Sequence, residues 1–186
     1  MLWTGQSCAK AGPNGMLVRH GCGSGAWNAS AYSSKQAPGD ITLQFRCSSK
    51  QRTMVGLAIG NSNSNFSDID CAMFCDKGTL RAYELGKHTW DGPRYNDSQV
   101  LGVRRAGSVV TFLQNGTLLR TCSRRLSGNV LADVSMHDAQ GGVLEASWTG
   151  GGMSGTGASS CHIILNVCPY ISFEFLLVLV ECDAWN

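Results

Sequence analysis

Hydrophobic and polar residues alternate along DITLQFRC (40–47), where every second residue from Ile41 to Cys47 is apolar. Successive side chains of a β-strand point to opposite faces of its sheet, so this pattern predicts a strand with one buried and one solvated face. TMVGLAIG (53–60) is instead almost continuously apolar. That run predicts a central strand buried on both faces.

A second segment, GSVVTFLQNGTLLRTC (107–122), predicts a β-hairpin. Asn115-Gly116 lies between two apolar runs, and a type I′ turn needs a positive φ at both central residues, which Asn tolerates and Gly adopts readily. A two-residue turn would place Leu113 opposite Leu118 and Phe112 opposite Leu119. One face of the hairpin would then carry Val110, Phe112, Leu119 and Thr121.

Further strand patterns bring the series to about eight short strands, and no stretch between 27 and 150 shows a sustained helical period. The additional segments are 69–75, 79–86, 100–105, 129–138 and 141–150. Two polar stretches, 61–68 and 87–99, are predicted to be long loops. Regular short strands separated by turn residues predict an all-β protein, an antiparallel β-sandwich of the jelly-roll kind.

Composition divides the chain into four parts. Residues 1–26 are Gly-rich and are predicted to form an arm or a first edge strand, and residues 27–150 to form the sandwich domain. Residues 151–160 read as a Gly/Ser linker, and 161–186 as an apolar C-terminal tail. A membrane anchor in that tail is disfavoured, because Glu174 lies near the middle of the apolar run. A terminal strand packed on the sandwich is favoured, and a poorly ordered or non-native extension is the alternative.

Charge and cysteine content narrow the class of partner. The net charge of +2 over 186 residues, with basic residues gathered only in pairs, gives no reason to expect a nucleic-acid partner. Nine cysteines include no CxxC pair, and Cys71 and Cys75 would lie about 13 Å apart on one strand. That distance excludes a mutual disulfide or a shared zinc ion, and the cysteines are predicted to be buried or half-buried thiols. No signal peptide is visible, and the compartment stays undetermined.

Motifs for catalysis or metal binding do not emerge. Retaining glycosidases place two carboxylates about 5–5.5 Å apart, and no E-x-D-x-E pattern supplies them. Glu84 and Glu145 each stand alone on a predicted strand, and no nucleophile triad appears. Asp68, Asp70 and Asp76 could contribute to a calcium site, but they lack EF-hand spacing. The sequence predicts no catalytic residues, no metal and no cofactor.

The two long loops carry the candidate binding residues. Exposed aromatic rings offer flat apolar faces to a sugar or a peptide, and Arg, Asn and Asp supply oriented polar contacts. The predicted ligand-binding residues are Trp90, Arg94, Tyr95, Asn96 and Asp97 in one loop, Asn65 in the other, and Glu84 beside them. The alternative is that Trp90 and Tyr95 cap the core and that Glu84 hydrogen-bonds a neighbouring loop.

Several motifs together resemble concanavalin A-like lectin/glucanase sandwiches, in particular the SPRY-like and laminin-G-like modules of multidomain protist proteins. They are MVGLAIG before a loop, Ile69–Met73, Tyr83–Gly86, and VLGVRRAGSVVTFLQNG ending at Gly116. Ser98-Gln99 replaces the Gly-Asp usual before the fourth motif, so this chain lacks the carboxylate that the family has there. The resemblance covers residues 27 to about 150 and implies a sandwich that hosts lectins, glycosidases or protein-binding modules.

The hypothesis from the sequence is therefore a non-catalytic recognition module. It would bind a glycan or a protein segment through loops 61–68 and 87–99. One alternative is a structural module of a larger assembly with no free ligand. Another is a carbohydrate-active enzyme whose catalytic pair comes from distant positions.

Overall fold

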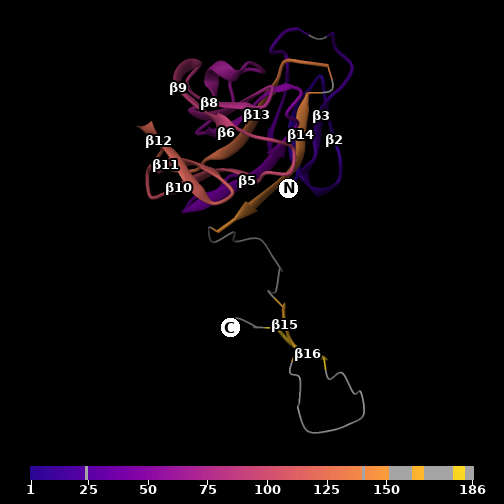
Figure 1. Ribbon diagram of the computed structural model, residues 1–186, viewed down its shortest axis with the longest axis vertical. Helices are drawn as coiled ribbons and strands as arrows, with labels where there is room; N and C mark the ends of the chain where they lie inside the picture. Colours follow the sequence, from indigo (N-terminus) through magenta and orange to yellow (C-terminus); the bar gives the residue numbers. More distant parts are fainter. Residues whose placement is uncertain (24, 140, 151–160, 166–177, 183–186) are drawn as a thin grey trace. The chain divides into compact units, whose positions relative to one another are not determined.

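The computed structural model describes residues 1–23, 25–139, 141–150, 161–165 and 178–182 (Figure 1). The chain forms two units, Met1–Met153 and Ser154–Asn186. In the second unit, β15 (Cys161–Leu165) pairs antiparallel with β16 (Val178–Cys182). The predicted 151–160 linker and most of the predicted tail lie outside the described residues. Within the described ranges no helix is long and apolar enough to cross a membrane.

The first unit contains two antiparallel sheets of seven strands each, so the all-β sandwich is confirmed. The first sheet has the order β1-β4-β13-β6-β7-β8-β9. Its strands are β1 (Trp3–Ser7), β4 (Ala29–Ser33), β6 (Arg52–Ala58), β7 (Cys71–Asp76), β8 (Thr79–Glu84), β9 (Lys87–Arg94) and β13 (Leu131–Met136).

The second sheet has the order β12-β11-β10-β5-β14-β3-β2. Its strands are β2 (Ala9–Ala11), β3 (Leu17–Arg19), β5 (Ile41–Cys47), β10 (Leu101–Ala106), β11 (Val109–Gln114), β12 (Thr117–Arg125) and β14 (Gly142–Thr149). Two short 3₁₀ helices, η1 (Pro13–Gly15) and η2 (Phe66–Asp68), complete the unit. Residues 1–26 thus supply β1 to the first sheet and β2 and β3 to the second.

The residues that the sequence patterns of β5 and β6 predicted to be buried are buried in the structure. Ile41, Leu43, Phe45 and Cys47 of β5 all face the core, as their alternation predicted. The nearly continuous apolar run of β6 is also explained: Val55 lies in the core between the sheets, whereas Met54 lies in a second cluster. Both faces of this central strand are therefore buried.

The prediction of a loop over 87–99 is wrong for its first eight residues. Lys87–Arg94 form β9, which pairs with β8 at the edge of the first sheet. Most of its side chains are exposed or half-buried, since an edge strand has few apolar neighbours. This strand was not recognised in the sequence because it contains Gly92 and Pro93. Both residue types are unfavourable inside central strands but are tolerated at an edge.

The hairpin at Asn115-Gly116 is confirmed, with φ of 49° and 80° at the two turn residues. Leu113 lies opposite Leu118 as predicted, but Phe112 lies opposite Arg120 rather than Leu119. A β-bulge between Phe112 and Leu113 inserts an additional residue on β12 and shifts the register. Thr121 is consequently exposed instead of sharing the buried face of Phe112.

The prediction that the cysteines are thiols is wrong for four of them. Cys71 of β7 is bonded to Cys122 of β12, which joins the two sheets through the core, and Cys8 is bonded to Cys22 near the N-terminus. Cys47 and Cys75 remain free and buried, and burial raises the pKa of the Cys47 thiol further above its ordinary value. The predicted absence of a Cys71–Cys75 disulfide is confirmed.

The outer faces of the two sheets differ. On the first sheet, a second hydrophobic cluster of Met54, Ile69, Ala72 and Phe74 is covered by Trp27, Phe66 and Tyr83. The rings of Trp27 and Phe66 meet edge to face, with centroids 5.0 Å apart. Loop 61–68 therefore lies against the outside of the first sheet. The outer positions of the central β5 of the second sheet are instead polar.

Arg105 of β10 fixes the loops at one end of the sandwich. Its guanidinium is buried and donates to the carbonyl oxygens of Ala37, Gly39 and Gly128, with Nη1 2.6 Å from the last. Arg105→Met is expected to destabilise the protein by about 3 kcal/mol, because three carbonyls, that of Ala37 buried and those of Gly39 and Gly128 partly buried, lose a charged donor. Urea unfolding of this variant measures the loss. Arg104→Met, one residue away and exposed, is the control and should change the free energy of unfolding by less than about 0.5 kcal/mol. Equal effects at the two positions would contradict this role.

Candidate functional site

The two loops predicted to form one binding site lie at opposite ends of the sandwich. Loop 61–68 leads into the first residue of β7, and the β8–β9 turn is beside it, since the Leu85 N–H donates to the Ile69 carbonyl. The segment after β9 lies at the other end, where the Tyr95 N–H donates to the carbonyl of Gly78 in the turn between β7 and β8. The structure therefore does not bring Asn65 together with residues 94–97.

Polar side chains of loop 61–68 hold the loop itself. The Asn65 side chain caps η2 by accepting from the Ser67 N–H at 3.2 Å. Asp68 Oδ2 accepts from the N–H groups of Ser62 and Asn63. Asp70 is ion-paired with Arg124 at 2.9 Å. These side chains therefore use much of their hydrogen-bonding capacity within the protein, and that capacity is not available to a ligand.

Residues 95–97 are engaged in the same way at the other end. Tyr95 is only 6% exposed and donates from its hydroxyl to the Ser48 carbonyl at 2.9 Å, and burial raises its pKa. Asn96 Oδ1 accepts from the N–H and hydroxyl of Ser98. Asp97 Oδ1 accepts from the Ser49 N–H, and hydrogen bonds from Ser49 lower the pKa of this carboxyl.

Three predicted site residues remain. Trp90 of β9 is half-buried against the main core, and Glu84 is buried and accepts from the Ser123 N–H and hydroxyl. The alternative that Trp90 and Tyr95 cap the core and that Glu84 bonds a neighbouring segment thus describes their geometry. Arg94 is exposed, and its side chain has no partner within the described ranges.

Two carboxylates beneath loop 61–68 are the residues that could hold a cation. Asp133 of β13 is 2% exposed, and its Oδ2, like Asp68 Oδ1, has no hydrogen-bond partner among the described residues. Burial, and secondarily the charge of Asp68, raises the pKa of Asp133 to about 8. These two carboxylate oxygens supply part of the oxygen set that a hard cation such as Ca²⁺ takes. Elsewhere in the described part of the chain no three His, Cys, Asp or Glu residues gather into a metal site.

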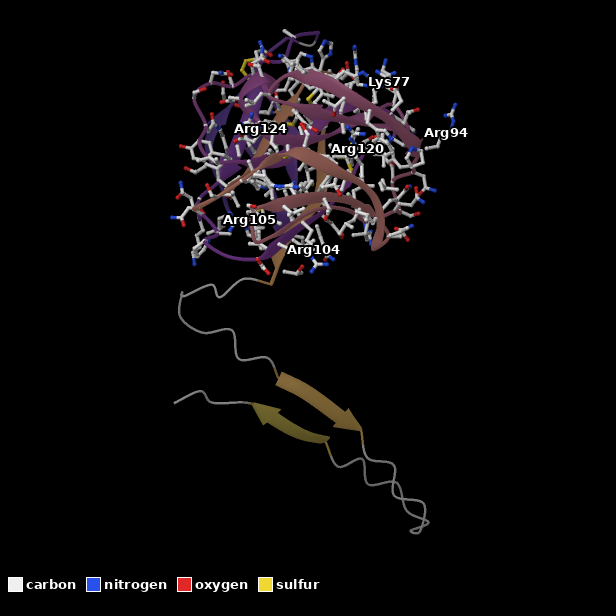
Figure 2. All side chains as sticks on the ribbon, turned by 90° about the vertical axis from the view of Figure 1, so that its left-hand side faces the viewer. Lys77, Arg94, Arg104, Arg105, Arg120 and Arg124 are labelled. Atoms are coloured by element: carbon white, nitrogen blue, oxygen red, sulfur yellow. A yellow bond between two sulfur atoms is a disulfide. The ribbon has the colours of Figure 1, made fainter. Side chains whose placement is uncertain are left out.

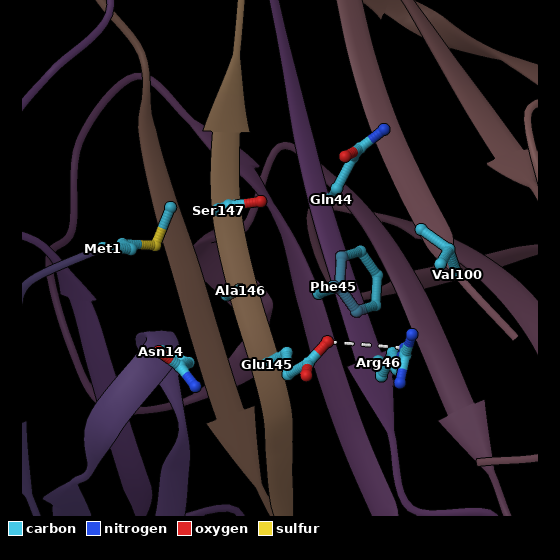
Figure 3. A pocket seen from close by; sticks show the side chains of 9 residues that line it. All are labelled: Met1, Asn14, Gln44, Phe45, Arg46, Val100, Glu145, Ala146 and Ser147. Carbon is cyan, nitrogen blue, oxygen red and sulfur yellow. Dashed lines mark ion pairs between the residues drawn. The ribbon is translucent and has the colours of Figure 1, made fainter. Parts of the chain in front are cut away.

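A hollow lies on the outer face of the second sheet, over β5 and β14 (Figure 3). Its volume is about 330 Å³. Its lining is mixed. The polar residues are Gln44 and Arg46 from β5, Glu145 and Ser147 from β14, and Asn14 from η1, and the apolar ones are Met1, Phe45, Val100 and Ala146. We call this the first hollow. None of these residues was predicted from the sequence, because the alternation at 40–47 places Gln44 and Arg46 outward without marking them as ligand contacts.

Local backbone geometry builds the wall of the first hollow. Gly15, at φ 72°, packs so closely on β14 that a Cβ would lie 2.1 Å from the Ala146 carbonyl oxygen. The Trp3 indole N–H donates to the Gly15 carbonyl at 2.8 Å. Only glycine fits this position, and η1 is thereby held against β14 with Asn14 exposed at the rim.

The polar groups of the first hollow remain available to a ligand. Across the strands, the Arg46 guanidinium and the Glu145 carboxylate are 3.4 Å apart and both partly exposed (Figure 3). The side chains of Asn14, Gln44 and Ser147 make no hydrogen bond to any residue that the structure describes. The hollow thus combines a neutralised charge pair with amide and hydroxyl groups open to solvent.

β10, β11 and β12 carry five arginines and no aspartate or glutamate. Figure 2 shows Lys77, Arg94, Arg104, Arg105, Arg120 and Arg124 spread over this view. Arg105 is buried, and Arg124 is paired with Asp70. The expectation that nucleic acid is not a partner stays a prediction. The single carboxylates Glu84 and Glu145 lie on different sheets, so they do not form a pair.

No protein-family model matches the sequence, and no curated protein matches it. Solved structures do match. The SPRY domain of human HERC1 is 14% identical with a TM-score of 0.55, over 74% of this chain and 91% of that one. The Emp47p carbohydrate recognition domain is 11% identical with a TM-score of 0.51, over 80% and 88%.

An enzyme also matches: alginate lyase AlgAT5 of polysaccharide lyase family 7 is 13% identical with a TM-score of 0.50, over 76% of this chain and 81% of that one. Identities this low establish the fold alone, since one fold hosts many functions. The chain is a concanavalin A-like β-sandwich, the fold that SPRY domains, carbohydrate recognition domains and polysaccharide lyases share.

Proposed function

We propose that this sandwich is a non-catalytic recognition module that binds a glycan on the open face of its second sheet. The observation that carries the proposal is the set of unengaged polar side chains at the first hollow. Asn14, Gln44 and Ser147 have no partner among the described residues, whereas Asn65, Asn96 and Asp97 are engaged in their own loops. The proposal moves the site from the sandwich ends to a sheet face.

The chemistry of the first hollow favours a hydroxylated ligand. Pockets for apolar small molecules are lined mainly by hydrophobic and aromatic side chains. The first hollow has a mixed lining, in which planar amides, a hydroxyl and the Arg46–Glu145 pair lie among apolar residues and can form directed hydrogen bonds with hydroxyl groups. Sharing a fold with the Emp47p carbohydrate recognition domain is compatible with this choice.

Removing a polar side chain from the first hollow is expected to weaken glycan binding. Gln44→Ala and Ser147→Ala each delete hydrogen bonds of about 1–1.5 kcal/mol, so each should lower affinity roughly tenfold. The measurement is a screen of the purified protein against an immobilised glycan library, followed by titration of each hit. Thr121→Ala, an exposed residue on the same sheet at edge strand β12, is the matched control and should bind like wild type.

Other outcomes identify the alternatives. Binding that is unaffected by Gln44→Ala and Ser147→Ala but lost in Arg94→Ala would place the site at the sandwich end. A screen without any hit for wild type would contradict glycan recognition and favour a protein partner or a structural module. Hydrolysis of a polysaccharide that is lost on Glu145→Gln would identify an enzyme.

A further inference from the structure

A second hollow lies on the same face of the second sheet. Its volume is about 250 Å³, and its polar lining comes from Asp40, Thr42, Arg104 and Thr149. Thr42 of β5 lies opposite both Thr149 of β14 and Arg104 of β10. The second hollow therefore covers the same central strands as the first.

The two hollows follow one line along β5 and β14. Arg46, Gln44 and Thr42 occupy successive outward positions of β5, and Glu145, Ser147 and Thr149 face them from β14. The six residue steps from Arg46 to Asp40 span about 20 Å in an extended strand. Gly102 of β10 lies opposite Gln44, and the Leu113 side chain of the neighbouring β11 packs over it. A ligand in contact with both hollows would be elongated.

Charges balance in each hollow. The first contains the Arg46–Glu145 pair, and the second contains the Arg104 guanidinium and the Asp40 carboxylate. Asp40 Oδ1 already accepts from the Gly107 N–H at 2.6 Å, and Arg104 has no ion-pair partner in the described part of the chain. A strongly anionic or cationic polymer would meet one like charge in each hollow, so a neutral ligand fits best.

The sheet also disfavours an extended peptide over β5. This strand is paired with β10 on one side and with β14 on the other, so strand addition cannot occur there. The outward side chains of β5 itself are Thr42, Gln44 and Arg46, which offer hydrogen bonds rather than an apolar pocket to a peptide side chain. Recognition at this strand therefore depends on side-chain hydrogen bonds to a hydroxyl-rich chain.

From these observations we infer that the ligand is a linear, uncharged glycan that lies along β5 and β14 and contacts both hollows. The inference rests on the proposed function and specifies its ligand class. It assigns Arg104 and Thr149 to the same recognition surface as Gln44 and Ser147.

Calorimetric titration with manno-, cello- and laminari-oligosaccharides of two, four and six residues tests the inference. For the series that binds, affinity should rise at least tenfold from the disaccharide to the hexasaccharide. Arg104→Ala should lower hexasaccharide affinity about tenfold and leave disaccharide affinity unchanged, whereas Gln44→Ala should lower both. Arg125→Ala removes an exposed arginine of β12 and is the matched control, with no expected change.

Several results would overturn the inference while leaving the proposed function intact. They are equal affinity for short and long oligomers, an Arg104→Ala variant that binds the hexasaccharide like wild type, and tighter, salt-sensitive binding of polygalacturonate. In each case Gln44→Ala would still weaken binding. Absence of binding to every neutral and acidic probe would overturn the proposed function itself.

Discussion

Replacing Asp133 with asparagine is expected to remove a loss of stability that the wild-type protein shows as the pH rises from about 4 to about 8. Burial raises the pKa of Asp133 from 3.8 to about 8 in the folded state. Between these values the folded protein retains a proton that the unfolded chain has released. Stability from this group is therefore full below about pH 4 and is lost as the pH approaches 8.

The expected slope is about −1.4 kcal/mol per pH unit, or a total on the order of 5 kcal/mol. The total is an upper limit, because water that enters beneath loop 61–68 would solvate the ionised carboxylate. Asp138 acts with the opposite sign and in a different window. The Arg52 guanidinium beside it holds the pKa of Asp138 well below its usual range, so its contribution is lost only under acidic conditions.

Urea unfolding of wild type and Asp133→Asn at pH 5, 7 and 9, in the presence of a chelator, measures this effect. The variant should gain stability relative to wild type as the pH increases. Asp91→Asn changes a carboxylate whose side chain is 70% exposed and should follow the wild-type profile. Parallel profiles for wild type and Asp133→Asn would contradict the assignment. A shallower wild-type slope when calcium replaces the chelator would indicate a cation between Asp133 and Asp68.

Removal of the Cys71–Cys122 disulfide is expected to destabilise the protein by about 4 kcal/mol. The bond closes a loop with a sequence separation of 51 residues and joins the two sheets. The chain-entropy relation for a loop of this length gives about 4 kcal/mol, because the crosslink restricts the unfolded chain. For a domain of this size the loss corresponds to a decrease in melting temperature of about 10 °C.

Thermal and urea unfolding of the Cys71→Ala/Cys122→Ala double variant measures the loss. The Cys8→Ser/Cys22→Ser variant is the comparison, since its loop has a sequence separation of only 14 residues and should contribute about 1 kcal/mol less. If the double variant at Cys71 and Cys122 melted at the wild-type temperature, the crosslink would have no stabilising role.

Much of the sandwich could be predicted from the sequence because side-chain periodicity is local. The alternation around Leu43 and the turn at Asn115-Gly116 each depend on a few adjacent residues. β9 could not be recognised in the same way, because an edge strand needs no apolar alternation and tolerates Gly92 and Pro93. The disulfide of Cys71 could not be predicted either, because its partner, Cys122, is distant in the sequence and belongs to the other sheet.

The missed strand also explains the misplaced site. The sequence predicted only two strands, now β7 and β8, after loop 61–68. Two antiparallel strands bring the chain back to the end of the sandwich from which it started, so both loops were expected at the same end. The additional strand β9 reverses the direction once more and carries Asn96 and Asp97 to the opposite end. The hollow over Gln44 could not be recognised from periodicity alone, because an outward polar residue has the same pattern whether or not it binds a ligand.

The most direct test of recognition by the sheet face is the mapping of amide chemical shifts on titration with a bound oligosaccharide. We expect the largest changes in β5 and β14 around Gln44 and Ser147, extending to Arg104 of β10 for a hexasaccharide. Changes confined to residues 61–68 or 94–99, with β5 and β14 unaffected, would contradict the account and return the site to the ends of the sandwich.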